Sequence, residues 1–225
     1  MEKNEKTNTG ERINDFVQRN RKPIFILFGV IVLLFAGSVA TFSLIDVFRK
    51  KAISEVEELG RRYEQTRYIY SEDGVKPGTD ALLADLETFA KKNSGIAGGK
   101  AWSIIAAIYT DRKDWPQVES AWRNAAVAAA KTYLGPVSLF NAAVAAEEQG
   151  KNADAIELYT QSASHPMPFP EAPHAQFAIG RLKEALNDRQ EAIEAYRVLL
   201  AKWPDVSLWA RLARSRIIAL EAGIK

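Results

Sequence analysis

The chain of 225 residues contains no cysteine and only two histidines. Without cysteine it can form no disulfide framework, thiol nucleophile or zinc–thiolate site. It also lacks the Gly-x-Ser-x-Gly segment of a serine-hydrolase nucleophile elbow. His165 and His174 lie in or beside a proline-rich stretch, where we expect surface histidines of a loop rather than metal ligands. We therefore expect no enzyme, cofactor, metal site or small-molecule substrate.

An excess of charge of one sign is also lacking. The chain has 30 basic and 28 acidic residues, and the part after residue 23 has 24 of each. Because a nucleic-acid-binding domain carries a basic patch, we expect no nucleic-acid partner. The acidic pairs Glu57-Glu58 and Glu147-Glu148 lie in helix-forming stretches, and we interpret them as solvated helix faces.

A glycine pair followed by lysine, Gly98-Gly99-Lys100, has only part of a phosphate-binding loop. That loop requires glycine where Ser94 stands and serine or threonine where Ala101 stands. We interpret the segment as a flexible lead-in to a helix.

One long apolar run is present, and it reaches from Ile24 to Ile45 over 22 uncharged residues. About 20 such residues cross the hydrocarbon core of a bilayer as a helix. We predict a leader at residues 1–23 and a transmembrane helix at 24–48. Basic residues flank the run on both sides, and their weak bias favours a cytoplasmic leader with the rest of the chain outside. The alternative is a signal peptide cleaved at Ala40, although apolar residues continue beyond that site.

The part after the run is predicted to be all-α, because it is rich in good helix formers and lacks alternating strand patterns. Three of its segments match at a constant spacing of 37 residues. Their first helices share a small residue, and their second helices share an alanine or valine followed four residues later by a large aromatic residue. These positions are Ala106, Ala143 and Gly180, then Val118, Ala155 and Ala192, and finally Trp122, Tyr159 and Tyr196.

This pattern resembles the tetratricopeptide repeat, a helix-turn-helix unit of about 34 residues that stacks into a solenoid. The resemblance implies a stalk helix and a degenerate first repeat at residues 49–92. It also implies three repeats plus a capping helix at residues 93–225, with the cap opening near Trp209. The pattern departs from the family in its longer spacing and in Gln176 and Lys183, which occupy positions that are usually apolar.

The layout of leader, membrane helix and repeats resembles the family of ancillary subunits of the bacterial Sec translocon. That resemblance implies a single-pass inner-membrane protein with periplasmic repeats. Its partners would be translocon subunits, a periplasmic chaperone or unfolded chains. The function expected is therefore a membrane-anchored protein–protein interaction module in translocation or chaperone recruitment. The alternative is a scaffold that holds a cell-envelope enzyme complex at the membrane.

In the repeat family, the inner face of the solenoid comes from the first helix of each unit. The family resemblance places Ser103, Ala107 and Thr110 on this face in the first unit. It implies a partner-binding site further along, at Phe140, Val144, Glu147, His174, Phe177, Arg181 and Glu184. An apolar groove with a polar rim suits a short extended or helical segment of a partner. The alternative is that Phe140 and Phe177 only pack under the stalk helix or the terminal helix.

Overall fold

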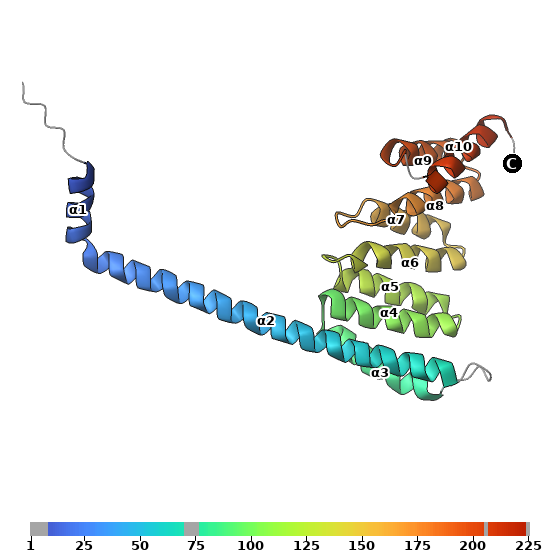
Figure 1. Cartoon of the computed structure of the whole chain (residues 1–225). Helices are drawn as coiled ribbons and strands as arrows, with labels where there is room; N and C mark the ends of the chain where they lie inside the picture. The colour runs from blue at the N-terminus through green and yellow to red at the C-terminus, as the bar shows by residue number, and fades with distance from the viewer. Residues whose placement is uncertain (1–8, 70–76, 205–206, 224–225) are drawn as a thin grey trace, which may run out of the picture. The chain divides into compact units, whose positions relative to one another are not determined.

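The computed structural model describes residues 9–69, 77–204 and 207–223. These ranges contain helices joined by turns and no strand, which confirms the all-α prediction (Figure 1). The helices are α1 (Thr9–Arg19), α2 (Arg21–Ile69), α3 (Pro77–Lys92), α4 (Gly95–Asp111), α5 (Trp115–Ala128), α6 (Leu134–Glu148), α7 (Asn152–Ala163), α8 (Ala172–Ala185), α9 (Arg189–Lys202) and α10 (Ser207–Glu221).

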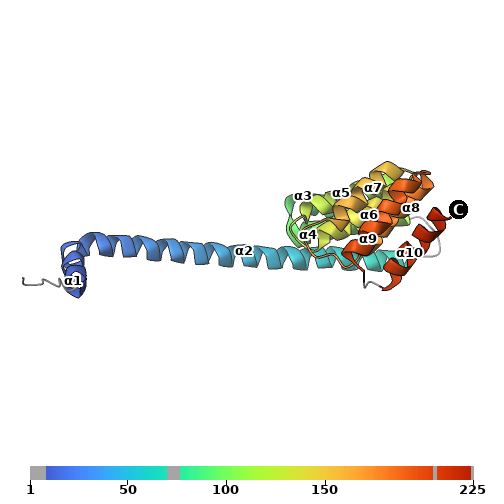
Figure 2. The ribbon, with the colours of Figure 1, turned by 90° about the horizontal axis from the view of Figure 1, so that it is seen from above.

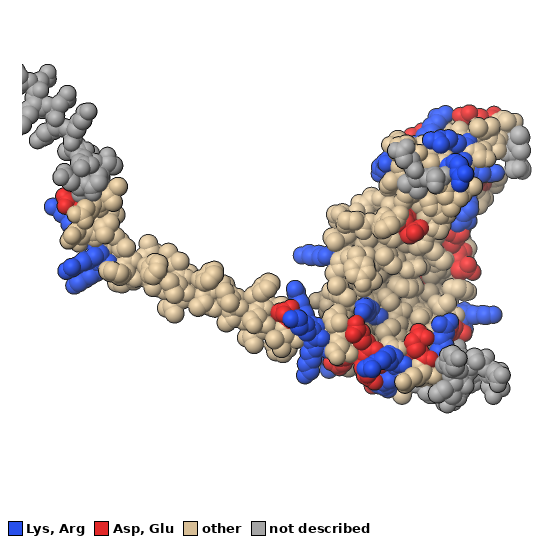
Figure 3. Space-filling model, viewed as in Figure 1, with Lys and Arg blue, Asp and Glu red and all other residues tan. Residues whose placement is uncertain are grey.

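The chain divides into two compact parts, an N-terminal part up to Lys51 and a repeat domain from Ala52 onward. In the N-terminal part, α2 carries the apolar run, and its residues are exposed from Arg21 to Lys51. By length and composition, this is the one helix of the described residues that could cross a membrane. Figure 3 shows the uncharged stretch with Lys and Arg side chains at both of its ends.

The repeat domain is built from successive helix pairs that lie side by side (Figures 1 and 2). Helices α4 and α5, α6 and α7, and α8 and α9 form the three pairs, and α10 follows α9. The second helices begin at Trp115, Asn152 and Arg189, which are spaced by 37 residues. The spacing found in the sequence is therefore the period of the helix pairs.

The turn inside each pair has the same backbone geometry. Lys113, Gly150 and Asn187 have positive φ angles of 57°, 72° and 60°. The N–H of the following residue donates back to a carbonyl in the last turn of the first helix, to Tyr109 at 3.0 Å, Ala146 at 3.0 Å and Lys183 at 2.9 Å. This is the left-handed C-terminal cap of a helix. Since these turns are short, the residues beyond the usual 34 lie between pairs.

Small residues sit where the two helices of a pair cross. Ala106 and Ala143 are fully buried, as are Ala155 and Ala192 on the second helices. At Gly180, an added Cβ would lie 2.7 Å from Cδ1 and Cζ of Tyr196 and closer still to Cε1. Only glycine therefore lets the Tyr196 ring pack against α8. This close packing is the physical reason for the small residue that the repeat pattern shares.

The C-terminal part of α2 packs with α3 and α4 in a separate core cluster. Val56, Leu59 and Tyr63 of α2 join Leu82, Leu86 and Phe89 of α3, all of them buried. The Tyr63 hydroxyl donates a hydrogen bond to Asp111 at the end of α4, at 2.8 Å. The α3 residues have i, i+4, i+7 spacing and form one apolar stripe on that helix. The boundaries proposed for the degenerate repeat remain a prediction.

One expectation about individual residues was wrong. The Gly98-Gly99 pair is not a flexible lead-in, because α4 begins at Gly95 and both glycines are buried within it. A Cβ on Gly99 would lie 2.7 Å from Cβ of Ala129, so the pair permits close packing of α4 against the end of α5. Gln176 is buried at its usually apolar position, where its Nε2 donates a hydrogen bond to the Ala195 carbonyl at 3.0 Å.

Candidate binding surface

The first helices of the three repeats, α4, α6 and α8, present matching positions along one face of the repeat domain. Those positions form three sets with a spacing of 37 residues, and the residue type changes along each set. The sets are Ser103, Phe140 and Phe177; Ala107, Val144 and Arg181; and Thr110, Glu147 and Glu184. The first repeat has small residues at all three positions, whereas the later repeats have large or charged residues at every matching position except Val144.

An open groove of about 1120 Å³ lies beside the small residues of the first unit. The C-terminal part of α2, together with α4, α5 and α6, lines it. Apolar side chains supply much of this lining, including Val56, Ile104, Trp122 and Val137. Charged residues from α2 and α4 also line it, and Glu57 forms an ion pair with Lys100 at 3.2 Å. Concave sites with apolar linings and a few polar groups are typical binding sites.

The size of the side chains explains why the groove is open at the first unit. Ser103 and Ala107 line it and leave its space unfilled. At the positions that match Ser103, the phenylalanine rings of α6 and α8 pack against neighbouring aromatic side chains. The open part of this face therefore lies toward α2 and α4.

In the second unit, Phe140 is surrounded by aromatic neighbours. Its ring centroid lies 5.2 Å from Tyr159, 5.9 Å from Phe169 and 5.0 Å from His174. The Tyr159 contact is edge-to-face, a favoured arrangement of aromatic pairs. Phe169 comes from the proline-rich linker, so this linker folds back onto the face.

His174 continues the aromatic cluster to the terminal helix. It lies in α8, half-buried, with its ring stacked 4.1 Å from Trp209 of α10. The expectation of a surface loop histidine was wrong here, because the linker ends before His174 and α10 covers the ring. Burial lowers the pKa of His174 below its ordinary value, despite the opposing effect of Glu171.

Phe177 also packs inside the molecule. Its ring lies 5.2 Å from Tyr196 and 5.4 Å from Trp209. Phe177 and Trp209 belong to the core cluster at the C-terminal end of the solenoid. These are the contacts with the terminal helix that the packing alternative expects, and partner binding by the two phenylalanines stays a prediction.

The two glutamates of the predicted site hold matching networks. Glu147 accepts hydrogen bonds from the Tyr159 hydroxyl at 3.2 Å and from Arg181 at 2.5 Å. One repeat later, Glu184 accepts from the Tyr196 hydroxyl at 2.5 Å and from Arg216. Each network joins both helices of one unit to the first helix that follows. The expectation of a solvated helix face was therefore wrong for Glu147, which is partly buried in its network. Its neighbour Glu148 is exposed, as expected.

The networks also change the acid–base behaviour of their members. Burial and the neighbouring carboxylate raise the pKa of both tyrosines, so each hydroxyl stays protonated and donates. Burial alone would raise the pKa of Glu184, but its bonds from Arg216 and Tyr196 outweigh this effect and lower it. These groups hold the repeats together through hydrogen bonds and ion pairs.

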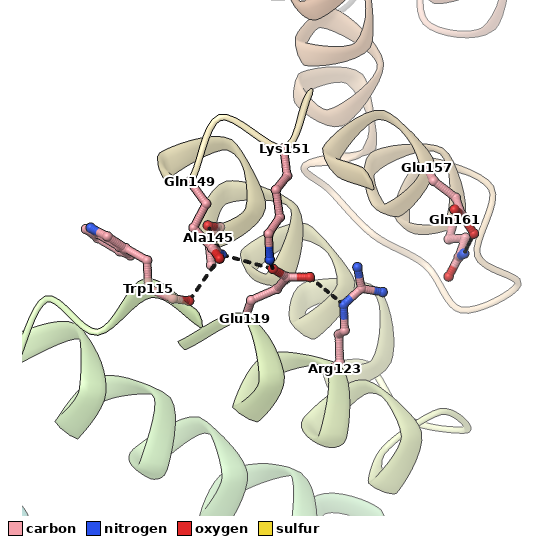
Figure 4. Close-up of polar contacts among 8 residues, drawn as sticks. All are labelled: Trp115, Glu119, Arg123, Ala145, Gln149, Lys151, Glu157 and Gln161. Atoms are coloured by element: carbon pink, nitrogen blue, oxygen red, sulfur yellow. Dashed lines mark hydrogen bonds and ion pairs between the residues drawn. The ribbon is translucent and has the colours of Figure 1, made fainter. Parts of the chain in front are cut away.

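Glu119 is a buried charge outside the predicted site. Its position in the second helix holds isoleucine in the other units, at Ile156 and Ile193. Figure 4 shows its carboxylate bound by three donors: Arg123 at 2.8 Å, Gln149 at 2.9 Å and Lys151 at 3.0 Å. Gln149 also donates to the carbonyls of Trp115 and Ala145. The network ties α5 to the turn of the next unit. A charge at a position that is apolar in the other repeats was the signal for it.

Candidate chemistry is sparse in the part of the chain that the structure describes. No group of three or more histidine, aspartate or glutamate side chains in the described ranges could hold a metal ion. Among the predicted partner-binding residues, Val144 and Arg181 are exposed. The others lie in the aromatic contacts or the ion-pair networks, and partner binding by this set remains a prediction.

Comparison with known proteins identifies the repeats. A family model described as "Tetratricopeptide repeat" matches residues 174–205, which cover most of α8 and α9. The chain is also 33% identical over 230 residues to a "TPR repeat-containing protein" of Treponema pallidum (strain Nichols). That match covers 94% of this chain and 94% of the relative. Neither comparison points to a catalytic family or to a Sec subunit. The chain belongs to the tetratricopeptide-repeat family, whose repeats form protein–protein interaction modules.

Proposed function

We propose that this protein is a membrane-anchored interaction module that holds a partner protein at a bacterial inner membrane. The observation that carries the proposal is the uncharged, exposed run in α2, followed in the same chain by a repeat unit with an open groove. Apolar side chains without protein cover suit the hydrocarbon core of a bilayer. The leader would lie in the cytoplasm and the repeats in the periplasm.

The groove between α2, α4, α5 and α6 is the proposed partner site. Its apolar lining and charged rim suit a short extended or helical segment of another protein. The predicted partner-binding residues of α6 and α8 would extend this site along the same face. In this proposal the partner reaches the exposed Val144 and Arg181, whereas Phe140, His174 and Phe177 form the closed end of the face. Glu147 and Glu184 keep α6 and α8 in place through their networks.

A role in protein translocation or chaperone recruitment is the finer part of the proposal. Its support is the order of leader, membrane helix and repeats, which resembles the translocon ancillary family. A scaffold for an envelope enzyme complex would need the same anchor and the same kind of groove. The identity of the partner separates the two functions.

Photo-crosslinking in living bacteria tests the site and the partner together. A photoreactive amino acid at Ser103 or Ala107 lies in the groove, while the same group at Val127, 80% exposed on α5, is the control. We expect adducts at the groove positions and none with that partner at Val127. Translocon or chaperone adducts support translocation, and envelope-enzyme adducts support the scaffold. Equal adducts at Val127 would remove the groove from the proposal.

Topology is tested separately with the full chain. Because the protein has no cysteine, the exposed Lys131→Cys variant carries a single thiol in the repeat unit. In intact spheroplasts, a membrane-impermeant thiol reagent should label this variant without permeabilisation. Labelling only after permeabilisation would place the repeats in the cytoplasm. Release of the protein from washed membranes would contradict the anchor itself.

A further inference from the structure

The leader contains a helix with one apolar face. In α1, Ile13, Phe16 and Val17 have the i, i+3, i+4 spacing that places side chains on one side of a helix. They are 60%, 64% and 45% exposed, so no described part of the chain covers them. Asp15 and Gln18 occupy the opposite side and are exposed as well. A polar leader free in solution has no need of such a face.

The helix lies close to the start of the apolar run. Asn20 separates α1 from α2, and its N–H donates to the Phe16 carbonyl at 3.0 Å. The Asn20 side chain donates to the same carbonyl at 2.9 Å. The Ile24 N–H in turn donates to the Asn20 carbonyl at 2.9 Å, so the backbone bonds continue across the junction. Within this N-terminal part, Figure 1 shows the chain changing direction between α1 and α2. The apolar face of α1 thus lies only a few residues from the first residue of the run.

Positive charge gathers at the same junction. Arg19, Arg21 and Lys22 are exposed, and they stand between the apolar face of α1 and Ile24. Basic residues next to a membrane helix are attracted to anionic lipid headgroups. Three apolar side chains are far fewer than the 20–30 residues a side of a stable protein interface. A lipid surface, which buries such a face without a shaped partner, therefore fits better than a second protein.

We infer that α1 is an interfacial helix that lies on the membrane surface. Ile13, Phe16 and Val17 enter the boundary between headgroups and acyl chains, while Arg19, Arg21 and Lys22 bind anionic headgroups. Helices with a small apolar face and a charged face bind membranes in this way. The inference rests on the proposed membrane anchor, and it converts the leader from a free tail into a second membrane contact.

Spin labelling of the full chain tests the inference. Because the chain has no cysteine, Phe16→Cys, Val17→Cys, Asp15→Cys and Gln18→Cys each give one labelled site. Leu34→Cys in the middle of the run is the anchor control. The labelled proteins are reconstituted into vesicles of phosphatidylcholine and phosphatidylglycerol. Collision rates with oxygen, which concentrates in the acyl region, and with a water-soluble nickel complex are then compared.

We expect the oxygen-to-nickel ratio at residues 16 and 17 to be several-fold higher than at 15 and 18. In vesicles of phosphatidylcholine alone, this difference should shrink. Equal ratios at the four leader positions, with Leu34 protected from nickel, would overturn the inference and leave the anchor intact. Nickel access at Leu34 would instead overturn the anchor. A leader face protected only after a partner protein is added would show protein docking and also overturn the inference. An unchanged difference without anionic lipid would overturn the headgroup contact.

Discussion

The two halves of the repeat face differ although they derive from one repeated pattern. Around α4 the face is open, because Ser103 and Ala107 are small and the lining is apolar. Around α8 the matching Phe177 is packed between Tyr196 and Trp209, and Arg181 and Glu184 hold ion pairs. One fold therefore provides an open half around α4, which holds the groove, and a closed half around α8. The difference comes from side-chain size at matching positions.

Overpacking the closed half should have the largest effect. Gly180→Leu places a side chain where even a Cβ overlaps the buried Tyr196 ring. We expect a loss of about 3 kcal/mol in the free energy of unfolding, at the upper end for overpacked cores. Urea unfolding of the full chain in detergent, followed by tryptophan fluorescence, measures it.

The matched control is Gly60→Ala in α2, where the nearest atom to the added Cβ is Ile104 Cδ1 at 3.5 Å. This variant should lose no stability, since alanine favours a helix more than glycine does. Because solenoid contacts are mainly between neighbours, Gly180→Leu should leave crosslinking at Ser103 intact. Equal unfolding curves for Gly180→Leu and wild type would contradict the assigned repeat register.

Emptying the closed half should have the next largest effect. Phe177→Ala removes the ring contacts with Tyr196 and Trp209. Truncating a fully buried phenylalanine costs about 3–5 kcal/mol, so we expect about 2 kcal/mol for this half-buried one. The same urea titration measures the loss. Val127→Ala, at an 80% exposed position, should change little, and similar losses in both variants would show that Phe177 is not part of the closed core.

Glu119 distinguishes the first unit from the others in a second way. Glu119→Ala leaves Gln149, Lys151 and Arg123 without their shared acceptor. We expect a loss of about 1.5 kcal/mol, at the lower end for hydrogen bonds to a charged group, because Arg123 and Lys151 are half-exposed to water. Glu119→Ile, which copies Ile156 and Ile193, should lose less than the alanine variant because it restores apolar packing. A greater loss for isoleucine would mean that the charge is needed for folding.

The same network predicts a dependence on pH. Burial would raise the pKa of Glu119, but the bonds from Lys151, Arg123 and Gln149 outweigh it, and the pKa is lowered. A lowered pKa stabilises the fold fully above the ordinary glutamate pKa of about 4.3. This stabilisation is lost as the pH falls through the lower folded value. Urea titrations at several acidic pH values should therefore show a shallower loss for Glu119→Ile than for wild type, and parallel curves would contradict the shift.

The smallest effect on stability should come from closing the open half. Ser103→Phe copies Phe140 and Phe177, and the groove has room for the ring. We expect the free energy of unfolding to change by no more than about 0.5 kcal/mol, as for most substitutions away from packed sites. Partner adducts through a photoreactive group at Ala107 should nevertheless disappear. Retained adducts in this stable variant would move the partner site away from the groove.

The repeat register could be predicted from the sequence, but whether each surface position is open or packed could not. Two closely crossing helices require a small residue, and this requirement repeats in the sequence at Ala106, Ala143 and Gly180. Whether Phe177 faces a partner or a neighbour depends on Trp209 of α10, and for Phe140 it depends on Phe169 of the proline-rich linker. Trp209 begins a fourth segment whose small residue, Ala213, follows Gly180 by 33 residues instead of 37. Trp209 of this segment lies over α8, and the linker folds back to bring Phe169 against Phe140 of α6. Neither contact is visible as a pattern in the sequence.

Glu119 shows a second kind of limit. Its i, i+4 pairing with Arg123 has the appearance of an ordinary surface ion pair in sequence. The other donors to its buried carboxylate, Gln149 and Lys151, come from a turn some 30 residues further along the chain. Comparison with Ile156 and Ile193 could have marked the position as internal, because a charge rarely replaces isoleucine without partners. The partners themselves required the structure.

The left-handed turns at Lys113, Gly150 and Asn187 make the solenoid modular, because each repeat passes through the same cap. Excision of residues 151–187 would join Gly150 to Asp188, and the chain would pass through the same cap into the next second helix. Whole periods can thus be lost or duplicated by recombination without a new junction having to evolve. A shortened chain of this kind should keep its helicity per residue by circular dichroism, while the distance from the groove to the terminal helix α10 contracts by one repeat.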